Sequence, residues 1–212
     1  MKAQDLSFPD PQQNLTYDDD LLLKADKAGG GEVLRFWESS RVFVVLGRTC
    51  VEEHNVYGDI CRQENVPVLR RSSGGGTVVQ GPGCFNFSLV LSKARHPDLV
   101  SITRSYEYIL KKTISALKVC GVEAGFRPVC DLAVPSDEKK FSGNAQRRGR
   151  THILHHGTLL YGFDLSLITR YLKLPPKMPE YRHARPHNDF ITNVSLNIPQ
   201  FKAALVSAWG VF

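Results

Sequence analysis

Short apolar runs separated by polar residues predict several strands in the first half of the chain. Before them, residues 18–27 predict a helix that opens on acidic side chains, which suits the positive end of a helix dipole. Gly29-Gly30-Gly31 then breaks that helix. The expected strands cover residues 33–37 and 42–46, read as a strand pair, and residues 66–69, 78–79 and 85–91.

The clearest helix covers residues 101–120, where apolar side chains recur at steps of three and four and form one face. Ser101 is a suitable N-cap and Gly121 a suitable stop. Further strands are expected at residues 131–134 and 153–160, and further helices at 165–172 and 199–209. So many strands before the first long helix predict an α+β fold with a largely antiparallel sheet. The length suits one domain over residues 1–212.

Composition narrows the choice of partner and compartment. The formal net charge of +6 favours acidic partners, such as nucleic acid or an acidic carrier protein. Because the chain lacks a dense Lys/Arg run with interleaved aromatic residues, we expect no nucleic-acid partner. It also lacks a signal-peptide core at its start and the roughly 20 apolar residues that cross a bilayer, so we expect no membrane association. The 5 cysteines form no C-x-x-C pair and predict reduced thiols in a cytoplasmic protein.

The segment of residues 70–88 carries the first chemical signal. It reads RRSSGGGTVVQGPGCFNFS. Three glycines before a β-branched run allow the backbone to approach a ligand closely, and exposed N–H groups there can hold a phosphate or carboxylate. Arg70 and Arg71 can add charge-assisted hydrogen bonds. A simple tight turn is the alternative interpretation of this segment alone.

Two further segments contain candidate polar groups. Residues 139–146, KKFSGNAQ, place lysines at the end of an expected strand, and a hairpin with its turn in residues 134–139 would bring Asp131 and Lys140 together. An exposed hairpin without a function is the alternative. Residues 152–160, HILHHGTLL, contain three histidines, but His155 and His156 point to opposite faces of a strand. A shared metal ion at these histidines is therefore disfavoured.

Taken together, these segments resemble the lipoate–protein ligase A family, within the biotin and lipoate ligase superfamily. The resemblance covers roughly residues 15–195, with the matching segments in the family's order and at family-like spacing. It implies a fold like the catalytic domain of class II synthetases, with a mixed, mostly antiparallel sheet flanked by helices. The matching segments are Val44 to Arg48, Arg70 to Val78, Asn86 to Ser88, Asp131-Leu132, Lys140 to Gln146 and His155 to Leu160.

The resemblance also implies roles for individual residues. Lys140 would touch the acyl carbonyl and the α-phosphate of ATP, and Asp131 would lie near the adenylate and its Mg²⁺. The implied nucleotide-binding residues are Arg71, Gly76, Thr77, Val78, Val79 and Lys140. The implied residues for the acyl substrate, lipoate, are Arg70, Ser72, Gly75, Asn86, Gly143, Ala145, His156 and Gly157. The implied partner is the acidic lipoyl-carrier domain of a 2-oxoacid dehydrogenase or of a glycine cleavage H-type protein.

The sequence departs from the family pattern in three respects. Gln80-Gly81 stands where the family often has His-Asp, and Cys130 stands where Asn often precedes the acidic residue. We also expect residues 1–212 to form the catalytic domain alone, without the small C-terminal accessory domain that the resemblance implies for two-domain ligases. Either a separate accessory subunit is needed for adenylate formation, or only the transfer step occurs, or the short ligase acts alone.

The leading interpretation is an ATP-dependent ligase that adenylates lipoate or octanoate and transfers the acyl group to a carrier lysine. The alternative is an ATP-independent octanoyl or lipoyl transferase with Cys130 as its nucleophile. Cys84 is expected to be structural. A non-catalytic acyl-binding or carrier-docking protein is a third interpretation, which the intact Lys140 argues against, and biotin ligation is a fourth.

Overall fold

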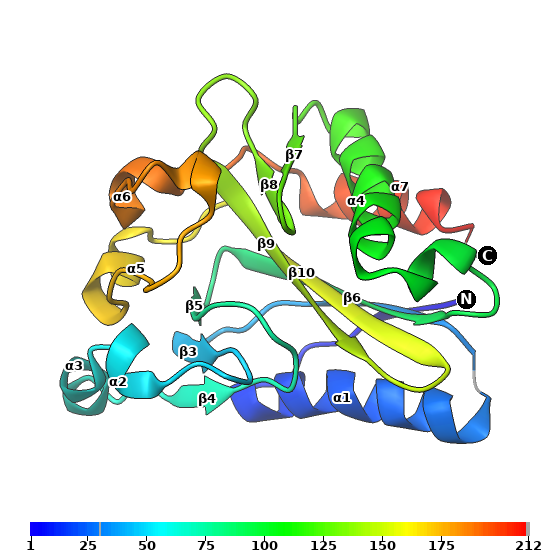
Figure 1. Ribbon diagram of the computed structural model, residues 1–212, viewed down its shortest axis with the longest axis horizontal. Helices are drawn as coiled ribbons and strands as arrows, with labels where there is room; N and C mark the ends of the chain where they lie inside the picture. Colours follow the sequence, from blue (N-terminus) through cyan, green and yellow to red (C-terminus); the bar gives the residue numbers. More distant parts are fainter. Residues whose placement is uncertain (30, 211–212) are drawn as a thin grey trace.

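A seven-stranded sheet and a three-stranded sheet form the framework of the molecule (Figure 1). The computed structural model describes residues 1–29 and 31–210. In the large sheet β1 and β2 run parallel and the other neighbours run antiparallel, which confirms the predicted α+β fold. Its strands, in spatial order, are β1 (Lys2–Asp5), β2 (Val33–Trp37), β6 (Cys84–Ser92), β10 (His152–Leu160), β9 (Lys140–Arg148), β8 (Asp131–Ala133) and β7 (Gly125–Arg127).

The small sheet has the order β4-β3-β5, and its strands are Val68–Arg70, Phe43–Leu46 and Val78–Gln80. β3 runs parallel to β4 and antiparallel to β5. The predicted pairing of residues 33–37 with residues 42–46 is wrong. β2 has β1 and β6 on its two edges while β3 has β4 and β5, so neither strand has an edge left for the other.

Helices cover both faces of the large sheet (Figure 1). α4 (Ile102–Val119) and α7 (Ile198–Ala208) pack on one face, over the main apolar core. α1 (Pro11–Ala28) packs on the other face, against Val90 of β6 and Leu154 of β10. Over the residues that the structure describes, no helix has the length and apolar character needed to cross a membrane. The shorter helices are α2 (Glu52–Asn55), α3 (Gly58–Gln63), α5 (Ser166–Tyr171) and α6 (His187–Phe190), with 3-10 turns at Pro97–Val100 and Glu180–Arg182.

The first helix begins earlier than the acidic residues predicted. Asp10 caps it by accepting a hydrogen bond from the backbone N–H of Gln12, and Gly29, with a φ of 60°, ends it. Asp18 was expected in the first turn, and this is wrong because the helix begins at Pro11. The buried Asp18 carboxylate pairs with Arg35 of β2 at 2.7 Å. Gly30, part of the predicted break, lies outside the described residues.

The hairpin that was expected to join Asp131 and Lys140 is confirmed. β8 and β9 are antiparallel, with Asp131 opposite Gly143, and residues 134–139 form the turn. β1 and the full length of β9 were not predicted, because their polar and basic residues hide the alternation of a strand. The short elements β7, α2, α3 and α6 were not predicted either. Apart from α1, the strands and helices that were predicted begin and end within two residues of the predicted bounds.

Candidate active site

A cavity of about 670 Å³ lies between the two sheets. β5 and the glycine-rich loop before it form one wall, and β9 and β10 form another. α5, α6 and the segment between them, residues 173–186, complete the enclosure; we call this segment the strap. The volume falls within the roughly 300–1,000 Å³ that is typical of small-molecule sites.

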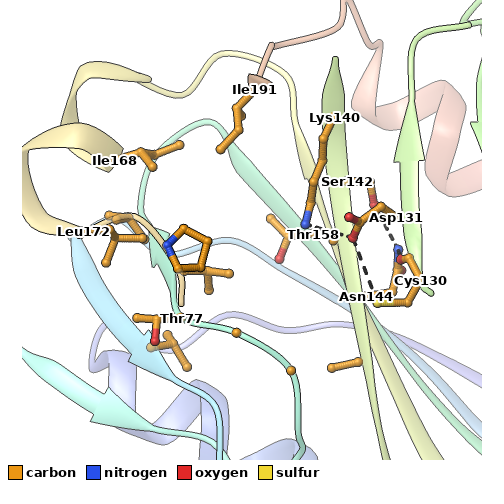
Figure 2. Close-up of a pocket in the computed structure, with 18 of the residues that line it drawn as sticks. Thr77, Cys130, Asp131, Lys140, Ser142, Asn144, Thr158, Ile168, Leu172 and Ile191 are labelled. Atoms are coloured by element: carbon orange, nitrogen blue, oxygen red, sulfur yellow. Dashed lines mark hydrogen bonds and ion pairs between the residues drawn. The ribbon is translucent and has the colours of Figure 1, made fainter. Parts of the chain in front are cut away.

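The ion pair between Lys140 and Asp131 lies on the wall of this cavity. The Lys140 Nζ is 2.8 Å from the Asp131 Oδ1, and the side chains are 26% and 10% exposed. Figure 2 shows the two side chains pointing toward one another from neighbouring strands. Gly143 makes room for the lysine, because a Cβ at Gly143 would lie 3.1 Å from the Lys140 Nζ. The hairpin therefore presents one ammonium group, already paired, to the cavity.

Arg71 holds the glycine-rich loop in shape. Its guanidinium donates hydrogen bonds to the backbone oxygens of Gly74 and Gly76, each at 2.7 Å, and to the Ser73 hydroxyl at 3.1 Å. Burial lowers the pKa of Arg71 to about 10, so it keeps its charge at neutral pH. Arg71 lines the cavity, but most of its donors serve the loop.

His155 and His156 lie on opposite faces of β10, as their adjacent positions on a strand required. His156 lines the cavity and its Nε2 is 2.7 Å from the Ser73 Oγ. His155 is buried on the core side, with its ring nitrogens at 3.2 Å from the side-chain amides of Gln146 and Asn144. Burial lowers the pKa of each histidine to about 3, so both are neutral at neutral pH.

Three polar side chains form a closed ring of hydrogen bonds on the cavity wall. Gln80 donates to the Thr158 hydroxyl at 2.7 Å, Thr158 donates to the Asn86 amide oxygen at 2.5 Å, and Asn86 donates back to Gln80 at 3.1 Å. The ring satisfies these groups with one another. Gln80 therefore contributes neutral hydrogen-bonding groups and no charge to this wall.

Apolar side chains face this polar wall across the cavity. Figure 2 shows Ile168 and Leu172 on the opposite side from Lys140. Ile191 also lines the cavity, but it lies beside Lys140, with which it forms a backbone β-bridge. Val78 and Val79 of β5 and Leu160 of β10 extend the apolar surface. The cavity thus has a charged region at Lys140 and a long apolar region, which suits a ligand with a carboxylate at one end and a hydrocarbon chain.

Most residues that the sequence proposed for the site do meet here. Arg70, Ser72 and Gly157 lie outside the cavity wall. Arg70 donates to the backbone oxygens of Gly47 and Cys50 at 2.9 and 2.7 Å, and the Ser72 hydroxyl donates to Asp19. Gly157 faces the core. The lining residues that were proposed are Arg71, Gly75, Gly76, Thr77, Val78, Val79, Asn86, Asp131, Lys140, Gly143, Ala145 and His156.

The strap was missed by the sequence reasoning. No role was predicted for this segment from the sequence, yet Pro175, Met178 and Arg182 line the cavity. Tyr181, in the same segment, donates a hydrogen bond from its hydroxyl to the Asp131 Oδ2 at 2.7 Å. The available signal was the density of basic and aromatic residues after the prolines, in the run EYRHARPHNDF of residues 180–190.

Residues 10–209 match the family model described as the lipoyl protein ligase A/B catalytic domain. The chain belongs to this family. It is 31% identical over 180 residues to the "Probable lipoate-protein ligase A" of Mycoplasma pneumoniae, covering 82% of this chain and 50% of that protein. It is 26% identical over 207 residues to the lipoate-protein ligase A subunit 1 of Thermoplasma acidophilum, covering 92% and 77%. The chain therefore spans half the length of the Mycoplasma relative and more of the Thermoplasma one.

Solved structures of the family share the fold. The bi-partite lipoate protein ligase of T. acidophilum superposes with a TM-score of 0.83 at 24% identity, covering 99% of this chain and 82% of that one. A T. acidophilum protein solved with bound lipoic acid gives 0.80 at 23% identity, covering 99% and 84%. A lipoate-protein ligase A solved with bound ATP gives 0.77 at 24% identity, covering 99% and 83%. The predicted class II synthetase and biotin ligase-like fold is confirmed.

Proposed function

We propose that this protein is a lipoate–protein ligase, which activates lipoate or octanoate with ATP and transfers the acyl group to a lysine of a carrier domain. The observation that carries the proposal is the Lys140–Asp131 pair on the wall of a cavity with a long apolar region. Membership of the family supports it, as do the solved relatives that hold lipoic acid and ATP.

The chemistry requires two steps. A lipoate carboxylate oxygen first attacks the α-phosphorus of ATP, forming the acyl adenylate as pyrophosphate leaves. The uncharged amine of the carrier lysine then attacks the acyl carbon, an amide bond forms, and AMP leaves while the amine loses a proton to water. Negative charge grows on oxygen atoms in both steps, and a fixed ammonium such as Lys140 stabilises that charge in a water-poor cavity.

In this proposal the nucleotide and the acyl chain bind to different parts of the cavity lining. The backbone of Gly76 to Val79 holds the nucleotide, and the apolar side chains of β5 and α5 hold the acyl chain. Neutral His156 and the ring around Gln80 offer hydrogen bonds without adding charge. Lys140 then supplies the counter-charge for the carboxylate of the ligand. The cavity is also lined by the basic residues Arg71, Lys173, Lys177 and Arg182.

The residues present fit Mg²⁺ held chiefly by ATP. Among the described residues that line the cavity, Asp131 is the one carboxylate, and the structure's described part contains no group of three or more His, Cys, Asp or Glu placed to bind a metal. Mg²⁺ commonly uses one or two carboxylates together with substrate phosphates and water. Asp131 would be its protein ligand, and the bound ion would neutralise phosphate charge.

The alternative, a transferase with Cys130 as nucleophile, needs a thiolate. Burial and the adjacent Asp131 raise the pKa of the Cys130 thiol to about 11, so the thiol is protonated at neutral pH. We expect Cys130→Ser to keep at least about half of the ligase activity, with Cys120→Ser, also partly buried, as the matched control. A loss of acyl transfer in Cys130→Ser alone would restore the transferase interpretation.

We propose an acidic lipoyl-carrier domain, of a 2-oxoacid dehydrogenase or a glycine cleavage H-type protein, as partner. The net charge of +6 supports an acidic partner. A separate accessory subunit is proposed as well, because the Thermoplasma relative is named subunit 1 and the Thermoplasma ligase is bi-partite. All 5 cysteines are free thiols, which supports the reducing cytoplasm as the compartment.

The decisive experiment supplies the pure protein with lipoic acid, magnesium ATP and an apo lipoyl domain. We expect pyrophosphate release that depends on lipoic acid, followed by a mass increase of the lipoyl domain. Release without transfer would show that this chain forms the adenylate without an accessory subunit. No product from lipoic acid and ATP, together with transfer from an octanoyl-carrier, would overturn the ligase proposal.

A further inference from the structure

Both oxygens of the Asp131 carboxylate are engaged, and by different parts of the fold. Oδ1 is 2.8 Å from the Lys140 Nζ, within the β8–β9 hairpin. Oδ2 accepts a hydrogen bond at 2.7 Å from the hydroxyl of Tyr181, which belongs to the strap. The carboxylate is therefore held at both ends, and its rotation would break one contact or the other.

The strap is docked onto the same hairpin at a second place. Arg185 donates to the backbone oxygens of Asp137 and Glu138 in the β8–β9 turn, at 3.1 and 3.2 Å, and to the backbone oxygen of Tyr181 at 3.0 Å. The Tyr181 ring lies 5.2 Å from the Phe190 ring, centroid to centroid. These contacts fix the Tyr181 ring independently of its hydroxyl.

The Tyr181 hydroxyl is the donor in its contact with Asp131, because an ionised carboxylate oxygen can only accept a hydrogen bond. Tyr181 does not itself line the cavity, whereas Asp131 and Lys140 do. Its effect on a bound substrate must therefore pass through Asp131.

We propose that Tyr181 is a positioning residue, which fixes the Asp131 carboxylate so that the Lys140 ammonium stays directed at the reacting oxygens. The inference rests on the proposed adenylation activity for its kinetic consequence, but the geometry of Lys140 can be tested without that activity. Without the hydroxyl, the carboxylate can turn about its Cβ–Cγ bond and release the lysine. The lysine then samples other orientations on its flexible stem.

The variant Tyr181→Phe removes the hydroxyl and keeps the ring against Phe190. Because a hydrogen bond to a charged group typically contributes about 1.5–3 kcal/mol, we expect kcat for lipoate-dependent pyrophosphate release to fall about tenfold to hundredfold. KM for lipoic acid and for ATP should change by less than about twofold. The matched control is Tyr161→Phe. It deletes a hydroxyl that donates a 2.9 Å hydrogen bond to Glu38, outside the cavity, and kcat should stay unchanged.

Two measurements distinguish a positioning role of Tyr181 from a role in stabilising the strap alone. If Tyr181 acts through Asp131, the double variant Asp131→Asn, Tyr181→Phe should be no slower than Asp131→Asn alone. Competitive acetylation with acetic anhydride, read by mass spectrometry, should show Lys140 reacting at least about threefold faster in Tyr181→Phe than in the wild type, with Lys139 as internal reference.

Additive losses in the double variant, or an unchanged Lys140 acetylation rate, would overturn the proposal. A rise in KM at unchanged kcat would also overturn it, because the hydroxyl would then only hold the strap closed. Absence of pyrophosphate release in the wild type, with an accessory subunit supplied as well, would refute the proposed ligase function. The acetylation rates would still decide whether Tyr181 positions Lys140.

Discussion

Two ion pairs of this protein differ in how many of their hydrogen-bonding groups have partners within the protein. Arg35 and Asp18 join β2 to α1, with side chains 0% and 7% exposed. The Arg35 guanidinium also donates to the backbone oxygens of Leu6 and Asn14 and to the Asn14 side chain, and the Asp18 carboxylate accepts from Ser88. Lys140, by contrast, has Asp131 as its one ion-pair partner in the described part of the chain, and faces the cavity.

The difference separates structural from chemical roles. A lysine ammonium has three N–H donors, so Lys140 retains capacity for a ligand, whereas the Arg35 donors are spent inside the protein. Because every guanidinium nitrogen of Arg35 has a protein partner, Arg35 fixes the position of α1 against the sheet. Lys140 has donors without a partner among the described residues, so its positive charge is available to a ligand in the cavity. The charge of a residue therefore says less about its role than the number of its partners.

Breaking the Arg35–Asp18 pair should give the largest effect on stability. In Arg35→Met the Asp18 carboxylate stays buried without its counter-charge, so we expect a loss of about 3–5 kcal/mol in the free energy of unfolding. Replacing both members, in Arg35→Met with Asp18→Leu, should recover part of that loss because no charge remains unpaired. Urea unfolding followed by circular dichroism measures both. A loss under about 1 kcal/mol in the single variant would contradict the assignment.

Breaking the Lys140–Asp131 pair should instead lower the activity. We expect Lys140→Ala to lower lipoate-dependent pyrophosphate release about 10²–10³-fold, the typical consequence of removing one group that stabilises developing oxyanion charge. The free energy of unfolding should fall by less than in Arg35→Met, because the Asp131 carboxylate keeps the hydrogen bond from Tyr181 and lies on the cavity wall. Lys139→Ala, one residue earlier and outside the cavity wall, is the control. Equal losses in the two variants would remove Lys140 from the mechanism.

Two glycines on the central hairpin allow the same contrast with a single methyl group. In Gly157→Ala the new Cβ would lie 2.1 Å from the Asn144 Oδ1 and 2.6 Å from the buried Phe87 ring, so we expect a destabilisation of about 1–3 kcal/mol. In Gly143→Ala the Cβ would meet the movable Lys140 Nζ at 3.1 Å. Stability should then be kept while kcat falls several-fold. Thermal melting and pyrophosphate release on both variants test the pair, and the opposite pattern would refute it.

The sequence predicted the parts of this contrast that depend on local pattern. The Asp131–Lys140 hairpin was predicted because its two strands are close in sequence and joined by a short turn. α4 followed from its apolar periodicity and from Ser101, whose hydroxyl accepts the Arg104 N–H. Twelve of the proposed site residues line the cavity, since the family motif fixed their identities.

The parts that failed depend on contacts between distant segments. The pairing of Asp18 with Arg35 joins a helix to a strand, and nothing local marks Asp18 as buried rather than helix-terminal. Arg70 and Ser72 carry the motif's residue types, yet their side chains are committed to backbone oxygens and to Asp19. Tyr181 meets Asp131 across 50 residues, which no periodicity reveals.

A third carboxylate sharpens the comparison, because its main partners are uncharged. Asp26 of α1 accepts hydrogen bonds from the backbone N–H groups of Arg150 and Thr151 in the β9–β10 turn and of His152 at the start of β10. It also accepts one from the Thr151 hydroxyl. Partial burial would raise its pKa, but these hydrogen bonds lower it to about 2. Since the folded pKa lies below the ordinary value of 3.8, the stabilisation is present above pH 3.8 and is lost as the pH falls through 2.

We therefore expect Asp26→Asn to lower the free energy of unfolding by about 1 kcal/mol at pH 7, after allowance for solvent screening. The difference from the wild type should shrink between pH 3.8 and pH 2, where the wild-type carboxylate becomes protonated. Asp20→Asn, on the same helix, is the control. Urea unfolding across this pH range measures the difference, and a difference that is constant with pH would show that Asp26 acts through shape rather than charge. The rate of pyrophosphate release at pH 7 should be unchanged, because Asp26 does not line the cavity and its carboxylate is already hydrogen-bonded within the protein.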